Sequence, residues 1–99
     1  MEAFADFETD RAGRYLSALC HHFGRKIEAH CLPDKGWVQF PLGRCEMTAD
    51  ERRLKLVVSA DDEQQLDQLV DILTRHLERF AFREDPQLEW HLDSTVRQS

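Results

Sequence analysis

The stretch KIEAHCLPDKGWVQFPLGRCEMTADERRLKLVVS, residues 26–59, decides the fold of this chain. Four segments in it alternate apolar with polar residues or gather β-branched residues, and both patterns are typical of strands. The predicted strands cover residues 26–32, 37–40, 44–48 and 54–59. Short segments rich in Pro, Gly and polar residues separate them, which favours turns. Four consecutive strands with such short connections predict an antiparallel meander.

An amphipathic helix is predicted on each side of the meander. The first covers residues 11–23, with Asp10 as the expected N-cap and Gly24 as the stop signal. Its apolar face contains Ala12, Tyr15, Leu16, Leu19 and Phe23. The second covers about residues 62–81 and begins at a capping box opened by Asp61. Its apolar face contains Leu66, Leu69, Val70, Leu73, Leu77 and Phe80.

Strands at residues 2–9 and 88–93 complete the element order β-α-β-β-β-β-α-β. Each helix has one apolar face, and both faces can be buried against one side of a curved antiparallel sheet. The sequence therefore predicts a two-layer α+β fold, whose element order resembles one half of the TATA-binding-protein fold. We expect a single domain over residues 1–93 and a frayed tail at 94–99. The expected core is centred on Leu19, Leu69, Leu73 and Phe80.

The composition is that of an ordinary globular protein, since 41% of the 99 residues are hydrophobic and 32% are charged. The formal net charge of −6 disfavours nucleic-acid binding, because neutralising phosphates requires an excess of basic residues. No apolar run approaches the ~20 residues that a membrane-spanning helix needs. The acidic segment MEAFADFETD at the N-terminus is unlike a secretory signal. We therefore expect a cytoplasmic protein that binds neither nucleic acid nor membranes.

The three cysteines, Cys20, Cys31 and Cys45, are odd in number and include no closely spaced pair. A disulfide framework is therefore not expected, and reduced thiols buried in the core fit a cytoplasmic location. Zinc ligands usually come in pairs a few residues apart, whereas neighbours such as His30 and Cys31 point to opposite faces of a strand. The sequence predicts neither a metal site nor a cofactor.

Motifs of familiar catalytic sites are absent from the sequence. It contains no nucleophile elbow, phosphate-binding loop, zinc-protease helix or dinucleotide fingerprint. A cysteine activated by histidine would need the two side chains close in space, which a sequence does not reveal. We predict no catalytic residue, and a small Cys/His enzyme stays as an alternative.

Two histidines are associated with the apolar stripes of the predicted helices. His76 lies on the stripe of the second helix, and His22 lies at the border of the first. A lone histidine on an apolar face is more often a core residue with one hydrogen-bond partner. Two of them, one in each helix, would also fit a shared polar pocket. The remaining histidines, His21, His30 and His91, are expected to face water.

The segment RHLERFAFRE, residues 75–84, gathers arginines at intervals of four residues where the second helix should end. One interpretation is an anion site in which Arg79, Arg83 and His76 bind a carboxylate or a phosphate, since arginine forks bind such groups in a bidentate way. With the histidine pair considered above, the candidate ligand-binding residues are His22, His76, Arg79 and Arg83.

The other interpretation of this segment is structural. Cationic side chains near a helix C-terminus interact favourably with the helix dipole. Arg83 and Glu84 would then fasten the helix end to the rest of the domain by ion pairs, while Phe82 would plug the domain where the chain leaves the helix. Because an ion-paired arginine leaves its carboxylate stranded when it is removed, this interpretation predicts that Arg83→Ala lowers stability by about 1–3 kcal/mol.

Three segments together resemble the bacterial domain-of-unknown-function family 2218. They are RAGRYLSALCHHFGRK, VQFPLGRCEMTAD and RHLERFAFREDPQLEW, of which the last is the most specific. The matching positions are His22, Gly24, Arg25 and Lys26; then Phe40, Pro41, Gly43, Arg44 and Cys45; then His76, Leu77, Arg79, Phe80, Ala81, Phe82, Arg83 and Glu84. The resemblance covers nearly the whole chain and implies a small cytoplasmic α+β protein, without implying an activity.

The favoured function is that of a non-enzymatic accessory protein that binds a small anionic ligand at the helix ends and the inner face of the sheet. A protein–protein interaction module, or a homodimer formed through a free sheet edge, is the main rival. A pocket lined by His22, His76 and arginine would favour the first function, and an exposed, flat, apolar edge strand would favour the second.

Overall fold

The structure is a computed structural model that describes residues 1–84, 86 and 88–92. Six strands, two α-helices and one 3-10 helix follow one another along the chain. Their bounds are β1 Glu2–Glu8, α1 Ala12–Gly24, β2 Ala29–Cys31, β3 Lys35–Gln39, β4 Gly43–Ala49, β5 Arg53–Ala60, α2 Glu63–Phe80, η1 Phe82–Glu84 and β6 His91–Leu92. This order confirms the predicted α+β element sequence.

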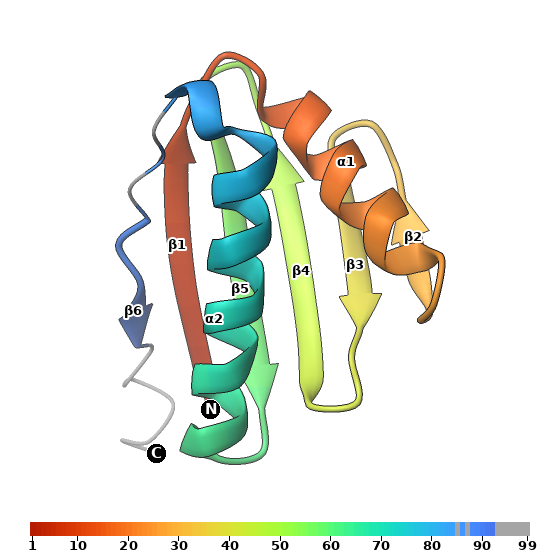
Figure 1. Cartoon of the computed structure of the whole chain (residues 1–99), viewed down its shortest axis with the longest axis vertical. Coiled ribbons are helices and arrows are strands. Elements are labelled where there is room, and N and C mark those ends of the chain that lie inside the picture. Colours follow the sequence, from red (N-terminus) through yellow and green to blue (C-terminus); the bar gives the residue numbers. More distant parts are fainter. Residues whose placement is uncertain (85, 87, 93–99) are drawn as a thin grey trace.

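The strands form one antiparallel sheet in the order β2-β3-β4-β5-β1-β6. Strands β2 to β5 are the predicted meander, and β1 lies between β5 and β6. Both helices cover the same face of the sheet (Figure 1), so the predicted two-layer architecture is confirmed. Helix α1 packs mainly on β2 and β3, and α2 packs on β5, β1 and β4. The opposite face is covered by neither helix.

The core lies between the two layers and is built from the alternate, inward-facing residues of the strands and from the helical stripes. Leu19, Leu69 and Leu73 are fully buried, as predicted. Phe80 is only partly buried, so this part of the core prediction is wrong. The reason is that Phe80 ends α2, where its ring contacts the exposed His22 of α1 at a centroid distance of 5.7 Å.

The helix caps differ by one residue from the sequence expectation. The N-cap of α2 is Asp62, whose side chain accepts a hydrogen bond of 2.8 Å from the backbone N–H of Gln65, and Asp61 precedes it. The N-cap of α1 is Arg11, without a side-chain cap. Asp10 therefore does not cap α1, and the Thr9 hydroxyl instead accepts a hydrogen bond from the Arg11 N–H at 3.1 Å.

Three strand boundaries in the structure differ from the predicted ones. The first meander strand begins only at Ala29, because the chain still turns after α1 and the Ile27 N–H donates to the Phe23 carbonyl. Gly36 lies in β3 rather than in a turn, at a point where a Cβ would lie 2.8 Å from the His30 carbonyl oxygen. The last strand is short, and residue 93 and the tail at 94–99 lie outside the described residues.

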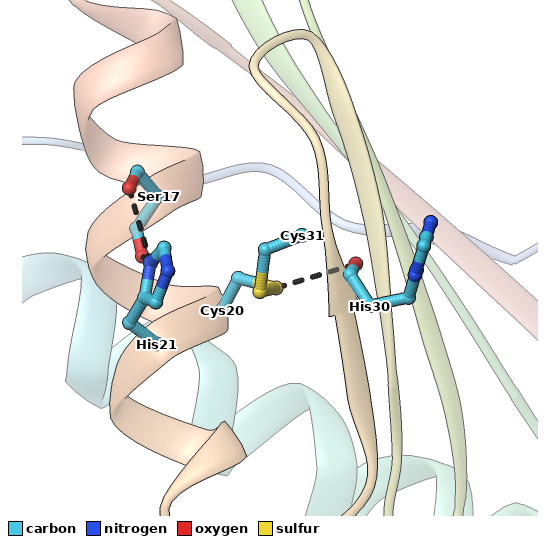
Figure 2. Close-up of a disulfide and its surroundings, with 5 residues drawn as sticks. All are labelled: Ser17, Cys20, His21, His30 and Cys31. Atoms are coloured by element: carbon cyan, nitrogen blue, oxygen red, sulfur yellow. Dashed lines mark hydrogen bonds between the residues drawn. A yellow bond between two sulfur atoms is a disulfide. The ribbon is translucent and has the colours of Figure 1, made fainter.

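Cys20 and Cys31 form a disulfide, which corrects the expectation of reduced cysteines. The pair is 11 residues apart in the sequence, but α1 packs across β2 and brings the two Cα atoms to 5.9 Å. Figure 2 shows this disulfide between helix and strand, with the Cys20 sulfur 3.4 Å from the His30 carbonyl oxygen. Cys45 is the buried core thiol that the sequence predicted for all three.

Candidate functional site

His22 of α1 and His76 of α2 lie side by side where the two helices contact each other, with ring centroids 5.0 Å apart. Three phenylalanine rings adjoin the pair, two in contact with a histidine and one, Phe40, in contact with Phe23. Phe23 lies 4.8 Å from the His76 ring and 4.9 Å from the Phe40 ring, and Phe80 contacts His22. We call these five residues, His22, Phe23, Phe40, His76 and Phe80, the interhelical aromatic cluster. The contact between one histidine of each helix is thus a feature of the tertiary structure.

The hydrogen bonding of His76 defines the tautomer of its neutral ring. Its Nδ1 lies 2.7 Å from the Ile72 carbonyl oxygen, one turn earlier in α2. A carbonyl oxygen can only accept, so Nδ1 carries the proton and Nε2 has the free lone pair when the ring is neutral. His76 is half-buried and His22 is exposed. His76 is therefore oriented by the helix backbone, whereas His22 forms the outer wall of the pair.

The pKa of His22 is lowered from the ordinary value of 6.5. Partial burial is the largest cause, followed by repulsion from His76, Arg25, Arg79 and Lys26. Arg25 and Lys26 follow α1 directly, and Arg79 lies in the last turn of α2. Cationic groups from both helices thus surround the histidine pair, and this excess of positive charge favours an anion over a proton.

A recess of about 330 Å³ opens beside His76 and is lined by Arg75, His76 and Arg79. Arg75 pairs with Asp71 at 3.2 Å, so its charge is partly compensated. Arg79 forms no ion pair among the described residues. The cation best placed to bind a ligand anion in this recess is therefore Arg79, with His76 next to it.

Arg83 does not line this recess. Helix α2 ends at Phe80, and η1 breaks the four-residue interval that placed Arg83 on the stripe of Arg79. The Arg83 guanidinium is exposed and its nearest aromatic ring is that of Phe82, at 5.8 Å from the ring centroid. Of the four candidate ligand-binding residues, the structure brings three together and leaves Arg83 apart.

The end of α2 is fastened by Glu84, which accepts a hydrogen bond from the Tyr15 hydroxyl of α1. This bond raises the pKa of Tyr15 and lowers that of Glu84. Phe82 is 68% exposed, so it does not plug the domain. The fastening interpretation is thus right for Glu84 and wrong for Phe82 and Arg83, because the 3-10 turn points the last two outward.

Arg25, Lys26, Phe23 and Phe40 belong to the site although sequence reasoning did not place them there. In the sequence, Arg25 and Lys26 stand out only as positions that match the family resemblance, and nothing indicates that Phe40 approaches the helices. His21, His30 and His91 are exposed, as expected. Among the described residues, no group of three or more His, Cys, Asp or Glu side chains could hold a metal ion.

Comparison with other proteins adds the family to this description. The model of the family described as "uncharacterized protein conserved in bacteria (DUF2218)" matches residues 4–91. The chain belongs to this family. Its fold is similar to that in the NMR structure of PA4090 from Pseudomonas aeruginosa, with a TM-score of 0.78 and 28% sequence identity over 91% of this chain and 94% of that one. No curated protein matches this chain at a significant level.

The family match confirms the resemblance seen in the sequence. The family is uncharacterised, so the match implies no activity for this chain. Within the part of the chain that the structure describes, neither helix is long and apolar enough to cross a membrane.

Proposed function

We propose that this protein binds a small anionic ligand, without chemical conversion, at the interhelical aromatic cluster. The observation that carries the proposal is the pair of imidazoles 5.0 Å apart, with one of them, His76, lining a recess together with Arg79. A carboxylate or phosphate group in the recess would accept hydrogen bonds from the Arg79 guanidinium, which is suited to bidentate contact. The half-buried rings of Phe23 and Phe80 would meet an apolar part of the ligand.

The histidines would make binding dependent on pH. A bound anion offsets the repulsion that lowers the pKa of His22, so it favours the protonated ring. Ligand binding is therefore coupled to proton uptake, and affinity should rise as the pH falls through the ordinary range of histidine. A change in affinity that follows histidine protonation would distinguish this site from one built from arginine alone.

The state of the cysteines supports binding rather than Cys/His catalysis. Burial raises the pKa of the Cys45 thiol to about 12, so it is protonated and a poor nucleophile. Cys20 and Cys31 are joined in the disulfide. None of the three therefore offers a thiolate to a histidine at neutral pH.

An NMR titration with sodium phosphate and, separately, sodium acetate at constant ionic strength tests the proposal. We expect saturable shifts of the His22 and His76 ring signals. Arg79→Gln should weaken binding about tenfold, because a charged hydrogen bond contributes roughly 1.5–3 kcal/mol. Arg83→Gln is the matched control, since it removes an equal charge at an exposed position that does not line the recess. Equal losses in both variants would indicate general charge attraction and contradict the site.

A further inference from the structure

The uncovered face of the sheet carries a row of side chains that crosses all six strands. Register pairs each member directly with the next. From edge to edge the row is His30, Trp37, Glu46, Val57, Phe4 and His91. No helix of the described chain packs on this face (Figure 1). Aromatic rings at these positions are half-buried at most, and they form a platform for a ligand rather than a second core.

Trp37 in β3 is the centre of the best-formed part of this platform. The His30 ring is stacked beside it, with a centroid distance of 6.2 Å and an interplanar angle of 24°. The Arg44 guanidinium carbon lies 4.4 Å from the Trp37 ring centroid. The disulfide contributes indirectly, because it ties down β2, the strand that holds His30 (Figure 2).

A hollow of about 410 Å³ lies at Trp37. Its lining includes His30, Leu32, Lys35, Trp37, Arg44 and Glu46. Aromatic rings, an aliphatic side chain, two cations and one carboxylate therefore meet in one depression. This hollow is separate from the recess at Arg75, His76 and Arg79, which is lined by helix α2.

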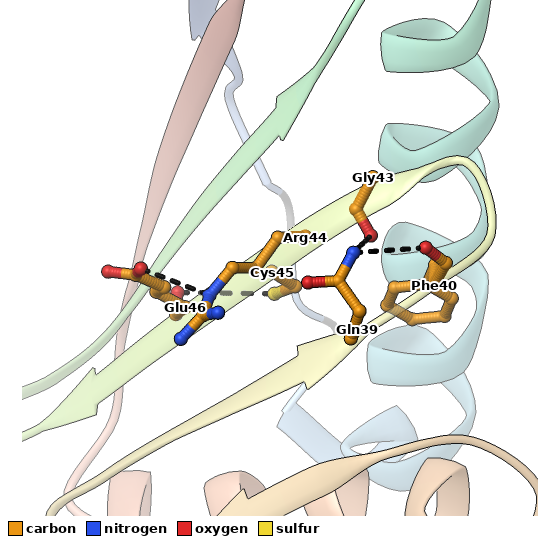
Figure 3. A network of polar contacts seen from close by, with 6 residues as sticks. All are labelled: Gln39, Phe40, Gly43, Arg44, Cys45 and Glu46. Atoms are coloured by element: carbon orange, nitrogen blue, oxygen red, sulfur yellow. Dashed lines mark hydrogen bonds and ion pairs between the residues drawn. The ribbon is translucent and has the colours of Figure 1, made fainter.

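The charge in the hollow is not fully compensated. Glu46 Oε2 lies 3.3 Å from Arg44 Nε, as Figure 3 shows. This contact is close enough for an ion pair but lacks hydrogen-bond geometry, so the buried Nε makes no hydrogen bond. Lys35 has no ion pair among the described residues. The hollow thus has an excess positive charge next to an aromatic surface.

We propose that this hollow is a second binding site, for a planar aromatic carboxylate. The ligand ring packs against Trp37 and His30 in the hollow, and its carboxylate interacts with Lys35 and with the Arg44 guanidinium that lies over the Trp37 ring. Contact with the half-buried Trp37 ring and attraction to two cations together predict an affinity in about the millimolar to micromolar range.

The charges elsewhere on this face favour a small ligand over a nucleic acid. Glu2, Asp6 and Glu8 alternate with the buried residues of β1 and therefore lie on the uncovered face. A single-stranded nucleic acid that stacked on Trp37 and Phe4 would bring its phosphates past these carboxylates. Since such binding depends on a continuous cationic track, the acids of β1 oppose it.

The test uses the Trp90→Phe variant, in which Trp37 is the remaining tryptophan. Benzoate is the probe, with benzyl alcohol as a neutral aromatic comparator and cyclohexanecarboxylate as a non-aromatic anion. We expect benzoate to produce saturable shifts at the Trp37 indole N–H and at the His30 ring. Binding of each comparator should be at least about fivefold weaker, because each lacks one of the two recognised groups.

A matched pair of variants tests the role of Arg44. Arg44→Met and Lys55→Met each remove a cation that lies over an aromatic ring of this face, because Lys55 Nζ is 5.6 Å from the Phe4 ring centroid. Only Arg44 lines the hollow. Arg44→Met should weaken benzoate binding about fivefold or more, and Lys55→Met less than twofold. Lys35→Met, at an exposed position, provides the same test if Arg44→Met does not fold.

Four results would overturn the proposal. They are shifts confined to His22 and His76, equal binding of benzyl alcohol and benzoate, no saturable binding, and Trp37 signals that change with protein concentration alone. The last result would assign the face to a second copy of the chain. Because the two sites have separate reporter residues, failure here leaves the phosphate titration of the interhelical site unaffected.

Discussion

The disulfide between Cys20 and Cys31 joins α1 to the edge strand β2, with the two Cα atoms 5.9 Å apart. Strand β2 has three residues and pairs on one side with β3. Its attachment to the domain therefore depends on a few backbone hydrogen bonds and on this covalent link. The disulfide therefore holds β2 in place, and β2 is the strand that contributes His30 to the platform on the uncovered face.

Reduction of this disulfide should lower the free energy of unfolding by about 2–3 kcal/mol, because the cross-link restricts a short loop of the unfolded chain. The measurement is a denaturant melt of the oxidised protein with and without reductant. In the Cys20→Ser/Cys31→Ser double variant, the reductant should have no effect on the midpoint. A shift of equal size in that variant would show that the reductant acts elsewhere.

Tyr15→Phe should destabilise the protein by about 1–2 kcal/mol, because the Glu84 carboxylate loses its hydrogen-bond donor. Arg83→Ala should stay within about 0.5 kcal/mol of the wild type, as exposed substitutions usually do. Urea melts of both variants give the comparison. The opposite ranking would restore the ion-pair role that the sequence suggested for Arg83.

The same hydrogen bond predicts a dependence on acid pH. The pKa of Glu84 is lowered from 4.5, first of all by the Tyr15 hydroxyl. Its contribution is present above the ordinary pKa and is lost as the pH falls through the lowered value. The stability difference between wild type and Tyr15→Phe should therefore shrink on acidification below about pH 4. A constant difference down to strongly acid pH would contradict this linkage.

His22 provides a second pH test, with its sign set by the lowered pKa. The unfolded chain binds this proton more tightly, so stability should rise with pH through the window just below 6.5. Arg79→Gln removes one of the repelling charges and should raise the pKa of His22, as measured by NMR of its ring signals. Arg83→Gln should leave that pKa unchanged, and an equal rise in both variants would exclude a local effect.

Gly36→Ala should destabilise the protein by about 1–3 kcal/mol, as overpacking of a filled site does. A Cβ there would lie 2.8 Å from the His30 carbonyl oxygen, which belongs to the neighbouring strand and has little freedom to move. Gly13→Ala is the control, because its Cβ would meet the Pro33 carbonyl oxygen at 3.4 Å and alanine favours helix. A thermal melt in which both variants match the wild type would show that β2 can shift.

The sequence by itself determined the two-layer α+β class, the meander of β2 to β5 and both helices. These features depend on local periodicity, which each segment carries in its own order of apolar and polar residues. The buried stripe of Leu66, Leu69, Leu73 and Leu77 is such a pattern, and the structure places all four in the core. The exact caps were less well predicted, because Asp61 and Asp62 are equivalent cap candidates until the first helical turn is built.

Tertiary structure alone decided which distant residues meet. The insertion of β1 between β5 and β6, the Cys20–Cys31 disulfide and the 5.0 Å approach of His22 to His76 all join segments whose separation in the chain gives no sign of contact. They follow from where the helices come to rest on the sheet. Arg83 lies apart from the site because α2 ends at Phe80 and a 3-10 helix follows. The prediction had assumed that the α-helix continues, which would have placed Arg83 one turn after Arg79 on the same face.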